Sequence, residues 1–389
     1  MTLINKNLEK INLCIVLLTL LAFLTHNYFR GLTFLWGILG VFYIKKYGYK
    51  KMGFEKPLIL YVTALFLSLI FALDQKYSFN EIYRHIFGFL APFFISQIAI
   101  NKRTKERAIN LIMLLLTIYF FIDLRILIYK KMFSYYVSRF SPLGIMPVEF
   151  CFIVGVILLY IFSCYLKEQN KILKIVNLIG IFLMLYVLLQ TKTRGAWIGL
   201  GISMTLIYLI NSKRLKENLI VIFLASFIGS GCLYIFRNTR RISPIYNRIL
   251  SIINITTDKS NSDRIIAWKI GISRFSERKI TGWGYKVKQT YNTIEFGGFQ
   301  KLDHPHNEYI SYLVGTGIVG LFSYLYLMVM IALKSFQNRD DICWLTMFGI
   351  TVYTLTYGVV ENLFHVTNSL FLFLFFLSIC LIKENKNED

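Results

Sequence analysis

Long apolar runs alternate with short polar segments along the whole chain. Each run extends over roughly 17–25 residues, the length that a helix needs to cross about 30 Å of hydrocarbon. Backbone groups inside a bilayer must find hydrogen-bond partners within their own segment, so these runs predict helices. The pattern therefore predicts an all-α polytopic membrane protein with about twelve transmembrane helices.

The centres of the apolar runs locate the predicted spans, and the loops between them predict the orientation. The centres lie near Leu18, Gly37, Leu65, Ala91, Leu115, Gly155, Phe182, Ser203, Phe223, Tyr324, Thr351 and Phe373. If the N-terminus is cytoplasmic, the loops that follow even-numbered spans are rich in Lys or Arg, and the short external loops have fewer positive charges. Basic residues collect in cytoplasmic loops, so we predict an inner-membrane protein with both termini in the cytoplasm.

One connection, on the external side, is much longer than the others. It contains Trp, Tyr and Phe and is not of low complexity, so we expect it to fold into short helices. The predicted organisation is nine spans in residues 1–236, a periplasmic loop in residues 237–308, and three spans with a cytoplasmic tail in residues 309–389.

A helix is predicted in the middle of this long loop. Three residues with N-cap chemistry precede it: Asn261, Ser262 and Asp263. Four large apolar residues then share one helix face: Ile265, Trp268, Ile272 and Phe275. We expect this helix to lie along the membrane surface or against the helix bundle.

The formal net charge of +22 at pH 7 raises the question of a nucleic-acid partner. Most of the basic residues lie in short loops between apolar runs, which is the distribution of a membrane protein. We therefore predict contacts with membrane lipids and no nucleic-acid partner. We also predict no metal site and no cofactor, because no His or Cys pair has zinc-ligand spacing and the external loops lack a tight acidic pair.

Two arginines on the external side are candidate anion ligands. Arg194 begins a span, and Arg264 lies in the first turn of the predicted loop helix. A guanidinium group binds phosphate oxygens with two parallel hydrogen bonds. The alternatives are an interfacial arginine that extends to water at position 194 and a solvated charge at position 264.

The most specific feature lies where the long loop re-enters the membrane. His304 and His306 flank Pro305, and Asn307 and Glu308 follow. A histidine at this boundary can accept a proton near neutral pH. The next span begins with three glycines that allow a helix or a ligand to approach its backbone: Gly315, Gly317 and Gly320.

Other polar residues lie in or near the predicted spans without a defined role. Arg84 is a possible supporting residue of the site, as are His304 and Asn307. The roles of six further residues stay open: His85, Asp123, Arg125, Glu149, Glu361 and His365.

The segment from His306 resembles the pattern of the O-antigen ligase family, which is His, then Asn, Ser or Gln, nine residues, Gly, two residues, Gly. In this chain the pattern positions are His306, Asn307, Gly317 and Gly320. The TRGAW segment around Arg194 is similar to the arginine motif that precedes a span in this family.

A second part of the resemblance lies in the long loop and the architecture. The stretch with Ser262, Arg264 and Trp268 is similar to the loop helix of the family. About twelve spans, cytoplasmic ends and one large late periplasmic loop are also typical of it. The motifs are shared in part with O-antigen polymerases and protein O-oligosaccharyltransferases.

The resemblance implies a GT-C-like membrane glycosyltransferase that acts in the periplasm without a metal. The donor would be O-antigen polysaccharide on undecaprenyl pyrophosphate, and the acceptor a sugar hydroxyl of lipid A–core, so that the product is lipopolysaccharide. His306 would be the catalytic base or the group that activates the acceptor, and Arg194 and Arg264 would bind the pyrophosphate. Alternatives are an O-antigen polymerase and, less favoured because most spans are apolar and no repeat is visible, a transporter of lipid-linked oligosaccharide.

Overall fold

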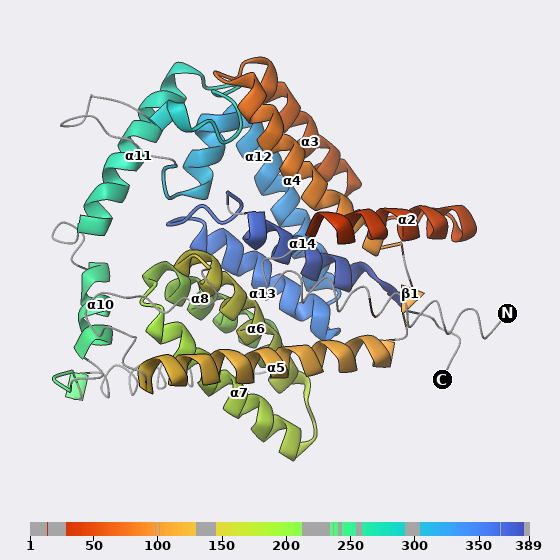
Figure 1. Cartoon of the computed structure of the whole chain (residues 1–389), viewed down its shortest axis with the longest axis vertical. Coiled ribbons are helices and arrows are strands. Elements are labelled where there is room, and N and C mark those ends of the chain that lie inside the picture. The colour runs from red at the N-terminus through yellow and green to blue at the C-terminus, as the bar shows by residue number, and fades with distance from the viewer. Residues whose placement is uncertain are drawn as a thin grey trace.

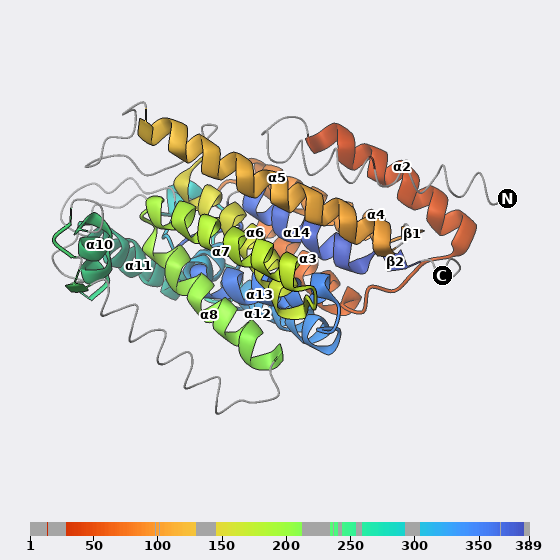
Figure 2. The same ribbon diagram turned by 90° about the horizontal axis from the view of Figure 1, so that it is seen from below.

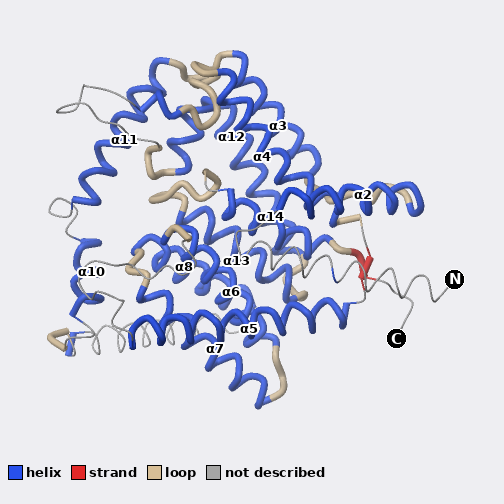
Figure 3. The backbone as a smooth tube through the Cα atoms, in the orientation of Figure 1, coloured by secondary structure: helices blue, strands red, loops and turns tan. Residues whose placement is uncertain are grey.

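The regular structure in the part of the chain that the structure describes is almost entirely helical (Figure 1). The computed structural model describes residues 14, 29–97, 99–100, 102–129, 145–211, 234–235, 237–239, 243–253, 259–291, 304–365 and 367–384. Within these ranges the strands are β1 (Ala99–Ile100) and β2 (Lys383–Glu384), which pair in parallel (Figure 3). The prediction of an all-α protein is therefore confirmed.

The helices fall into a bundle and a connecting segment. The bundle contains α2 (Phe29–Tyr47), α3 (Glu55–Ile70), α4 (Gln75–Ile95), α5 (Lys102–Tyr129), α6 (Pro147–Lys167), α7 (Lys171–Gln190), α8 (Arg194–Asn211), α12 (Glu308–Gln337), α13 (Ile342–Tyr357) and α14 (Thr367–Leu381). The segment between α8 and α12 contains α10 (Ser243–Ile253), α11 (Lys259–Glu277) and the short 3-10 helix η2 (Lys288–Tyr291).

Four of the described helices are long and apolar enough to cross a membrane, namely residues Lys105–Tyr129 of α5 and the whole of α6, α7 and α12. The apolar helices Ile342–Tyr357 and Ser369–Leu381 are shorter. Ten of the twelve predicted span centres fall within described helices, while those near Leu18 and Phe223 lie outside the described residues. The count of about twelve spans therefore stays a prediction.

Helix α6 lies at the centre of the bundle, where it contacts α7, α8 and α13. Within the apolar stretch of α6, 83% of the residues are buried in the protein, whereas only 22% are buried in the apolar stretches of α5 and α7. The outer helices consequently present large apolar side chains such as Ile172 and Phe182, which are 73% and 64% exposed. An apolar surface of this kind on long helices is suited to lipid contact.

The connections of the bundle gather at two opposite ends (Figure 2). At the end that carries β1 and β2, the Lys50 ammonium group donates to the Leu381 carbonyl oxygen at 2.7 Å. At the same end, Lys167 lies 3.6 Å from the Asp340 carboxylate. Lys50, Lys167 and Asp340 belong to segments that the sequence predicts to be cytoplasmic, and Leu381 is the last residue of α14, next to the predicted cytoplasmic tail.

The opposite end carries α10 and α11 (Figures 1 and 2). There the Leu73 amide donates to the Trp283 carbonyl at 2.8 Å, and the Arg248 guanidinium donates to the Lys192 carbonyl at 3.1 Å. The short turns at positions 73 and 192 and the segment of residues 237–308, which contains α10 and α11, are all predicted to be external. The predicted alternation of loops therefore agrees with their separation in space.

Helix α11 corrects two details of the predicted loop helix. It begins at Lys259, so the three residues expected to cap it lie inside its first turns. Its buried face contains Ala267 and Ile270, and Ile270 packs with Ile310 and Val314 of α12, whereas Ile272 is 57% exposed. Trp268 and Phe275 of the predicted face also pack against this cluster, so the predicted face is correct at these two positions and wrong at Ile272.

A kink in α12 holds the loop that follows α11. Gly317 has φ +67° inside this helix, which is a left-handed backbone conformation that favours glycine. The freed α12 backbone exchanges hydrogen bonds with the loop: Ile318 N–H donates to Lys279 at 2.8 Å and Trp283 N–H donates to Val314 at 2.8 Å. The predicted close approach to the glycine stretch is confirmed, and the approaching group is the chain's own loop.

Gly317→Ala is expected to destabilise this junction. A Cβ atom at position 317 would lie 2.0 Å from the Ile280 carbonyl oxygen, and the backbone there is left-handed. We expect a loss of about 1–3 kcal/mol and faster protease cleavage of residues 278–291. The matched control is Gly201→Ala in α8, where nothing lies within 4 Å of the added carbon. Equal thermal midpoints and cleavage rates for the two variants would contradict the expectation.

Candidate functional site

Two of the residues singled out in the sequence meet at a third, Glu361, in the connection between α13 and α14. The Arg264 guanidinium of α11 forms an ion pair with Glu361 Oε1. His306 Nδ1 lies 3.1 Å from Glu361 Oε2. The three side chains come from segments that are 97 and 55 residues apart in the chain. The structure thus brings Arg264 and His306 into one cluster.

The start of α12 determines where His306 lies. Asn307 is the N-cap of this helix, and its side-chain oxygen accepts from the Ile310 amide at 3.0 Å. Its side-chain nitrogen donates to the Val359 carbonyl at 2.8 Å. Asn307 therefore fixes the start of α12 to the segment that contains Glu361. His306 itself has φ +50°, a conformation that is uncommon outside glycine and is often found at functional sites.

Glu361 is ionised because of its two partners. It is 4% exposed, and burial by itself would raise the pKa of its carboxyl group. The hydrogen bond from His306 and the charge of Arg264 outweigh burial, and the pKa is lowered below its ordinary value of 4.5. The site consequently contains a fixed negative charge between a guanidinium group and an imidazole.

Glu361→Gln is expected to show how this charge contributes to stability. Because the pKa of Glu361 is lowered in the folded protein, its ionic contribution is fully present above about 4.5 and is lost as pH falls through the lower folded-state value. The native protein should therefore unfold at a higher temperature than the variant at pH 7, and the gap should narrow on acidification. Thermal unfolding between pH 3 and 8 measures this gap, with Glu277→Gln in an exposed pair as the control. A gap that widens at low pH would contradict the assignment.

Arg194 lies at the start of α8 and is 6% exposed. Its guanidinium donates to the carbonyl and hydroxyl oxygens of Ser251, at 2.8 and 2.7 Å. It also donates to Asn261 Oδ1 at 2.9 Å. Asn261 lies three residues before Arg264 on α11, so the two positions are about one helical turn apart. Arg194 therefore joins α8 to α10 and α11 beside the Arg264 cluster.

His304 lies on the other side of His306. The two ring centroids are 4.3 Å apart, and the His306 amide donates to His304 Nδ1 at 3.3 Å. The ring of His365 lies 5.1 Å from that of His304. The prediction that His304 supports the site thus agrees with its position, although its role stays a prediction.

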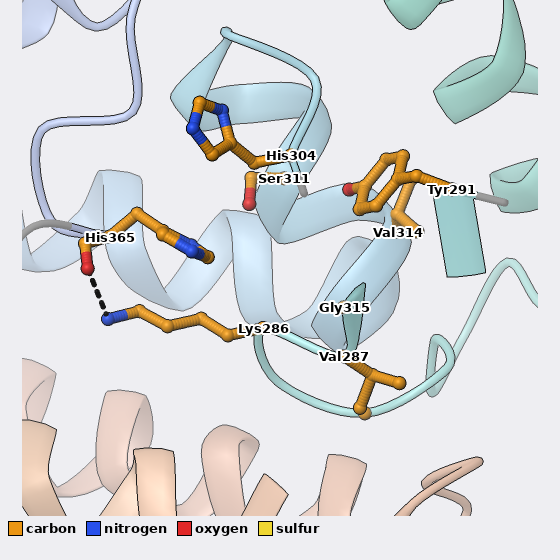
Figure 4. Close-up of a pocket in the computed structure, with 9 residues that line it drawn as sticks. Lys286, Val287, Tyr291, His304, Ser311, Val314, Gly315 and His365 are labelled. Atoms are coloured by element: carbon orange, nitrogen blue, oxygen red, sulfur yellow. Dashed lines mark hydrogen bonds between the residues drawn. The ribbon is translucent and has the colours of Figure 1, made fainter. Parts of the chain in front are cut away.

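A small pocket opens beside His304 (Figure 4). Its lining is Gly284, Lys286, Val287, Tyr291, His304, Ser311, Val314, Gly315 and His365. Lys286 Nζ donates to the His365 carbonyl at 3.0 Å. Burial lowers the pKa of Lys286 to about 8, against the raising effect of the Glu81 and Glu308 charges. Burial, together with the charges of Lys286 and His304, lowers the pKa of His365 to about 2, so its imidazole is neutral.

Arg84 lies on α4, outside the group formed by Arg264, His306 and Glu361. Its side chain is 54% exposed and pairs with Glu81 at 2.8 Å. Glu81 in turn lies 3.7 Å from Lys286. Arg84 is therefore connected to the pocket lining through two other charges, and its supporting role stays a prediction.

Among the described residues, no group of three or more His, Cys, Asp or Glu side chains is placed to hold a metal ion. Arg264 brings positive charge to the carboxylate that His306 contacts, and Arg194 is linked to the same helix as Arg264 through Asn261. Sequence analysis left the role of Glu361 open and did not assign this residue to the site. The available signal was a carboxylate beside an apolar span on the predicted external side, which is costly without a partner.

The helices and the charged cluster together define a class of protein. Long apolar helices with lipid-suited outer surfaces indicate a membrane protein whose charged cluster lies at one end of the bundle. Residues 179–325 match the family model described as O-antigen ligase, and the match supports the assignment of the chain to the O-antigen ligase family. The matched segment includes Arg194, Arg264 and His306, while Glu361 lies beyond it. No curated protein matches the chain.

Proposed function

We propose that the protein is an O-antigen ligase, a metal-independent glycosyltransferase that transfers O-antigen polysaccharide from undecaprenyl pyrophosphate to a sugar hydroxyl of lipid A–core. One observation carries the proposal: Arg264 and His306 both contact Glu361. Arg264 and His306 belong to the segment that matches the family. A base and a guanidinium at the edge of a helix bundle are the groups that this transfer requires.

The reaction needs two things from the protein, because the donor is already activated. The acceptor hydroxyl oxygen forms a bond to the anomeric carbon of the donor sugar, and His306 takes the hydroxyl proton. The bond between that carbon and the pyrophosphate oxygen breaks, and its electron pair leaves with the pyrophosphate. Arg264 and Arg194 would neutralise the charge on this leaving group. A positioned base contributes about 10²–10⁴-fold to such a step.

The location of the cluster suits a donor held in the membrane. Arg264 is partly accessible, with 21% of its side chain exposed, and the His306 side chain is 41% exposed. Arg264 lies on α11, at one end of the bundle (Figure 1), and His306 contacts the same carboxylate, that of Glu361. In this proposal the lipid-linked pyrophosphate reaches Arg264 and His306 from the bilayer, and the acceptor approaches them from water.

The orientation belongs to the same proposal. We place the basic end with β1 and β2 in the cytoplasm and the Arg264–His306 end in the periplasm, according to the positive-inside rule. The topology would be GT-C-like with about twelve spans of a bacterial inner-membrane protein. The boundaries would be those predicted from the sequence, with spans in residues 1–236 and 309–389 and a periplasmic segment in residues 237–308.

A deletion strain distinguishes ligation from polymerisation, the second reaction that the matched family allows. Loss of a ligase leaves long polymer on the lipid carrier and unsubstituted core, whereas loss of a polymerase leaves core that carries a single repeat unit. We expect the first result, with restoration by the native gene. Core capped with one repeat would establish the polymerase instead, and accumulation of donor on the cytoplasmic side would indicate a transporter.

Reconstitution tests the chemistry directly. Purified protein in vesicles, lipid-linked donor extracted from the deletion strain and purified lipid A–core should yield lipopolysaccharide at equal rates with and without EDTA. A rate that falls with the chelator and returns on addition of Mg²⁺ would contradict a mechanism in which arginines alone neutralise the pyrophosphate.

A further inference from the structure

We propose that Glu361 is a positioning residue that selects which nitrogen of His306 acts as the base. The inference rests on the proposed function, because it assigns Glu361 a part in the same transfer. Glu361 lies outside the segment that matches the family and is contributed by the connection after α13. The argument depends on its contacts with Arg264 and His306.

The first step concerns the proton on the imidazole. A carboxylate that is ionised can only accept hydrogen bonds. Since Glu361 Oε2 lies 3.1 Å from His306 Nδ1, the neutral imidazole must carry its proton on Nδ1 to make this bond. The other nitrogen, Nε2, then has a free electron pair and can accept the proton of an acceptor hydroxyl.

The second step concerns what holds the carboxylate. Arg264 donates to Glu361 Oε1, so the two oxygens have different partners and the carboxylate cannot rotate without losing one of them. The side chain of Glu361 is 6% exposed, whereas that of His306 is 41% exposed. The orienting group is thus buried and the reacting ring is accessible, which is the arrangement of a base with a fixed orientation.

Glu361→Gln is a sharp test because an amide has only one acceptor oxygen. Arg264 is a donor only and requires that oxygen. The amide NH₂ group then faces His306 Nδ1 and donates to it, which favours the opposite tautomer with the proton on Nε2. We expect kcat for transfer to fall about 10²–10⁴-fold, since a base in the wrong tautomer loses its contribution. The KM values should change by less than about threefold, because neither substrate loses a ligand.

Two further variants define the result. Glu277→Gln removes a carboxylate from an exposed pair on α11 and should retain native kcat. Glu361→Asp keeps the negative charge on a side chain that is one carbon shorter. Its kcat should be at least about tenfold higher than that of Glu361→Gln. Full activity in Glu361→Gln, or no recovery in Glu361→Asp, would overturn the proposal.

A spectroscopic measurement makes the proposal independent of the folding of any Glu361 variant. The chain has five histidines, so ¹⁵N-histidine labelling gives few signals, and His306→Asn identifies the one of interest. At alkaline pH in the native protein, we expect Nδ1 to be the protonated nitrogen and Nε2 the unprotonated one. The reverse assignment would overturn the proposal whatever the activity measurements show.

The outcomes also separate this inference from the proposed function. If His306→Asn retains transfer, the proposed function is wrong. If His306→Asn is inactive while Glu361→Gln is fully active and keeps the proton on Nδ1, the proposed function stands and the role of Glu361 is wrong.

Discussion

Replacement of His306 by alanine is expected to abolish attachment of O-antigen to lipid A–core while lipid-linked polymer accumulates. The imidazole is the group in the cluster that can take a proton from a hydroxyl, because a guanidinium is a donor only and Glu361 is held by its ion pair. A general base contributes about 10²–10⁴-fold, so transfer by purified protein should fall by at least about 10²-fold. Quantitative lipopolysaccharide gels of complemented deletion cells measure the effect in vivo.

The backbone at His306 calls for a second variant. With φ +50°, this position disfavours alanine, so part of any loss in His306→Ala could come from the start of α12. Asparagine adopts the left-handed conformation more readily than alanine. His306→Asn should therefore be as inactive as His306→Ala but unfold closer to the native temperature. Native transfer by either variant, at normal protein levels, would remove His306 from the mechanism.

Arg264→Lys is expected to lower kcat/KM for the lipid-linked donor by about 10²–10³-fold. A lysine keeps the positive charge beside Glu361 but loses the planar fork that binds a carboxylate and a phosphate at the same time. One side of the Arg264 guanidinium already donates to Glu361. The hydrogen bonds that a lysine cannot replace are therefore those to the pyrophosphate. The measurement is the initial rate of transfer in vesicles at several donor concentrations.

The control for this variant lies on the same helix. Arg274→Lys changes an arginine whose partner is Glu277, in an exposed pair near the end of α11, and it should keep native kinetics. Arg194→Lys should differ from both variants, because Arg194 joins Ser251 to Asn261 and its loss should also loosen α10. Equal kinetics for Arg264→Lys and Arg274→Lys would show that position 264 does not bind the donor.

The sequence predicted the elements of the bundle better than their contacts. Helix formation in an apolar run follows from the thickness of a bilayer and the need to satisfy backbone groups locally. The centres near Leu65, Gly155 and Tyr324 accordingly lie inside α3, α6 and α12. The pattern was only partly correct at α11, where Trp268 and Phe275 pack against the cluster shared with α12 but Ile272 is exposed.

The candidate site was predictable in part for the same reason. The chemistry of Arg264 and His306 could be read from residue type and from their position next to predicted spans. Asn307 was grouped with them, whereas its side chain caps α12 and holds Val359. A polar residue before a helix has the same sequence signature in both roles, and only its partners distinguish them.

By itself, the sequence determined a helical membrane protein, the separation of basic and less basic ends, and the residues with suitable chemistry, because each of these depends on local composition and on one length, that of the bilayer. Only the tertiary structure decided that Glu361 joins Arg264 to His306 and that the loop after α11 binds at Gly317. Those contacts connect residues far apart in the chain. They depend on how the helices pack, which no local pattern contains.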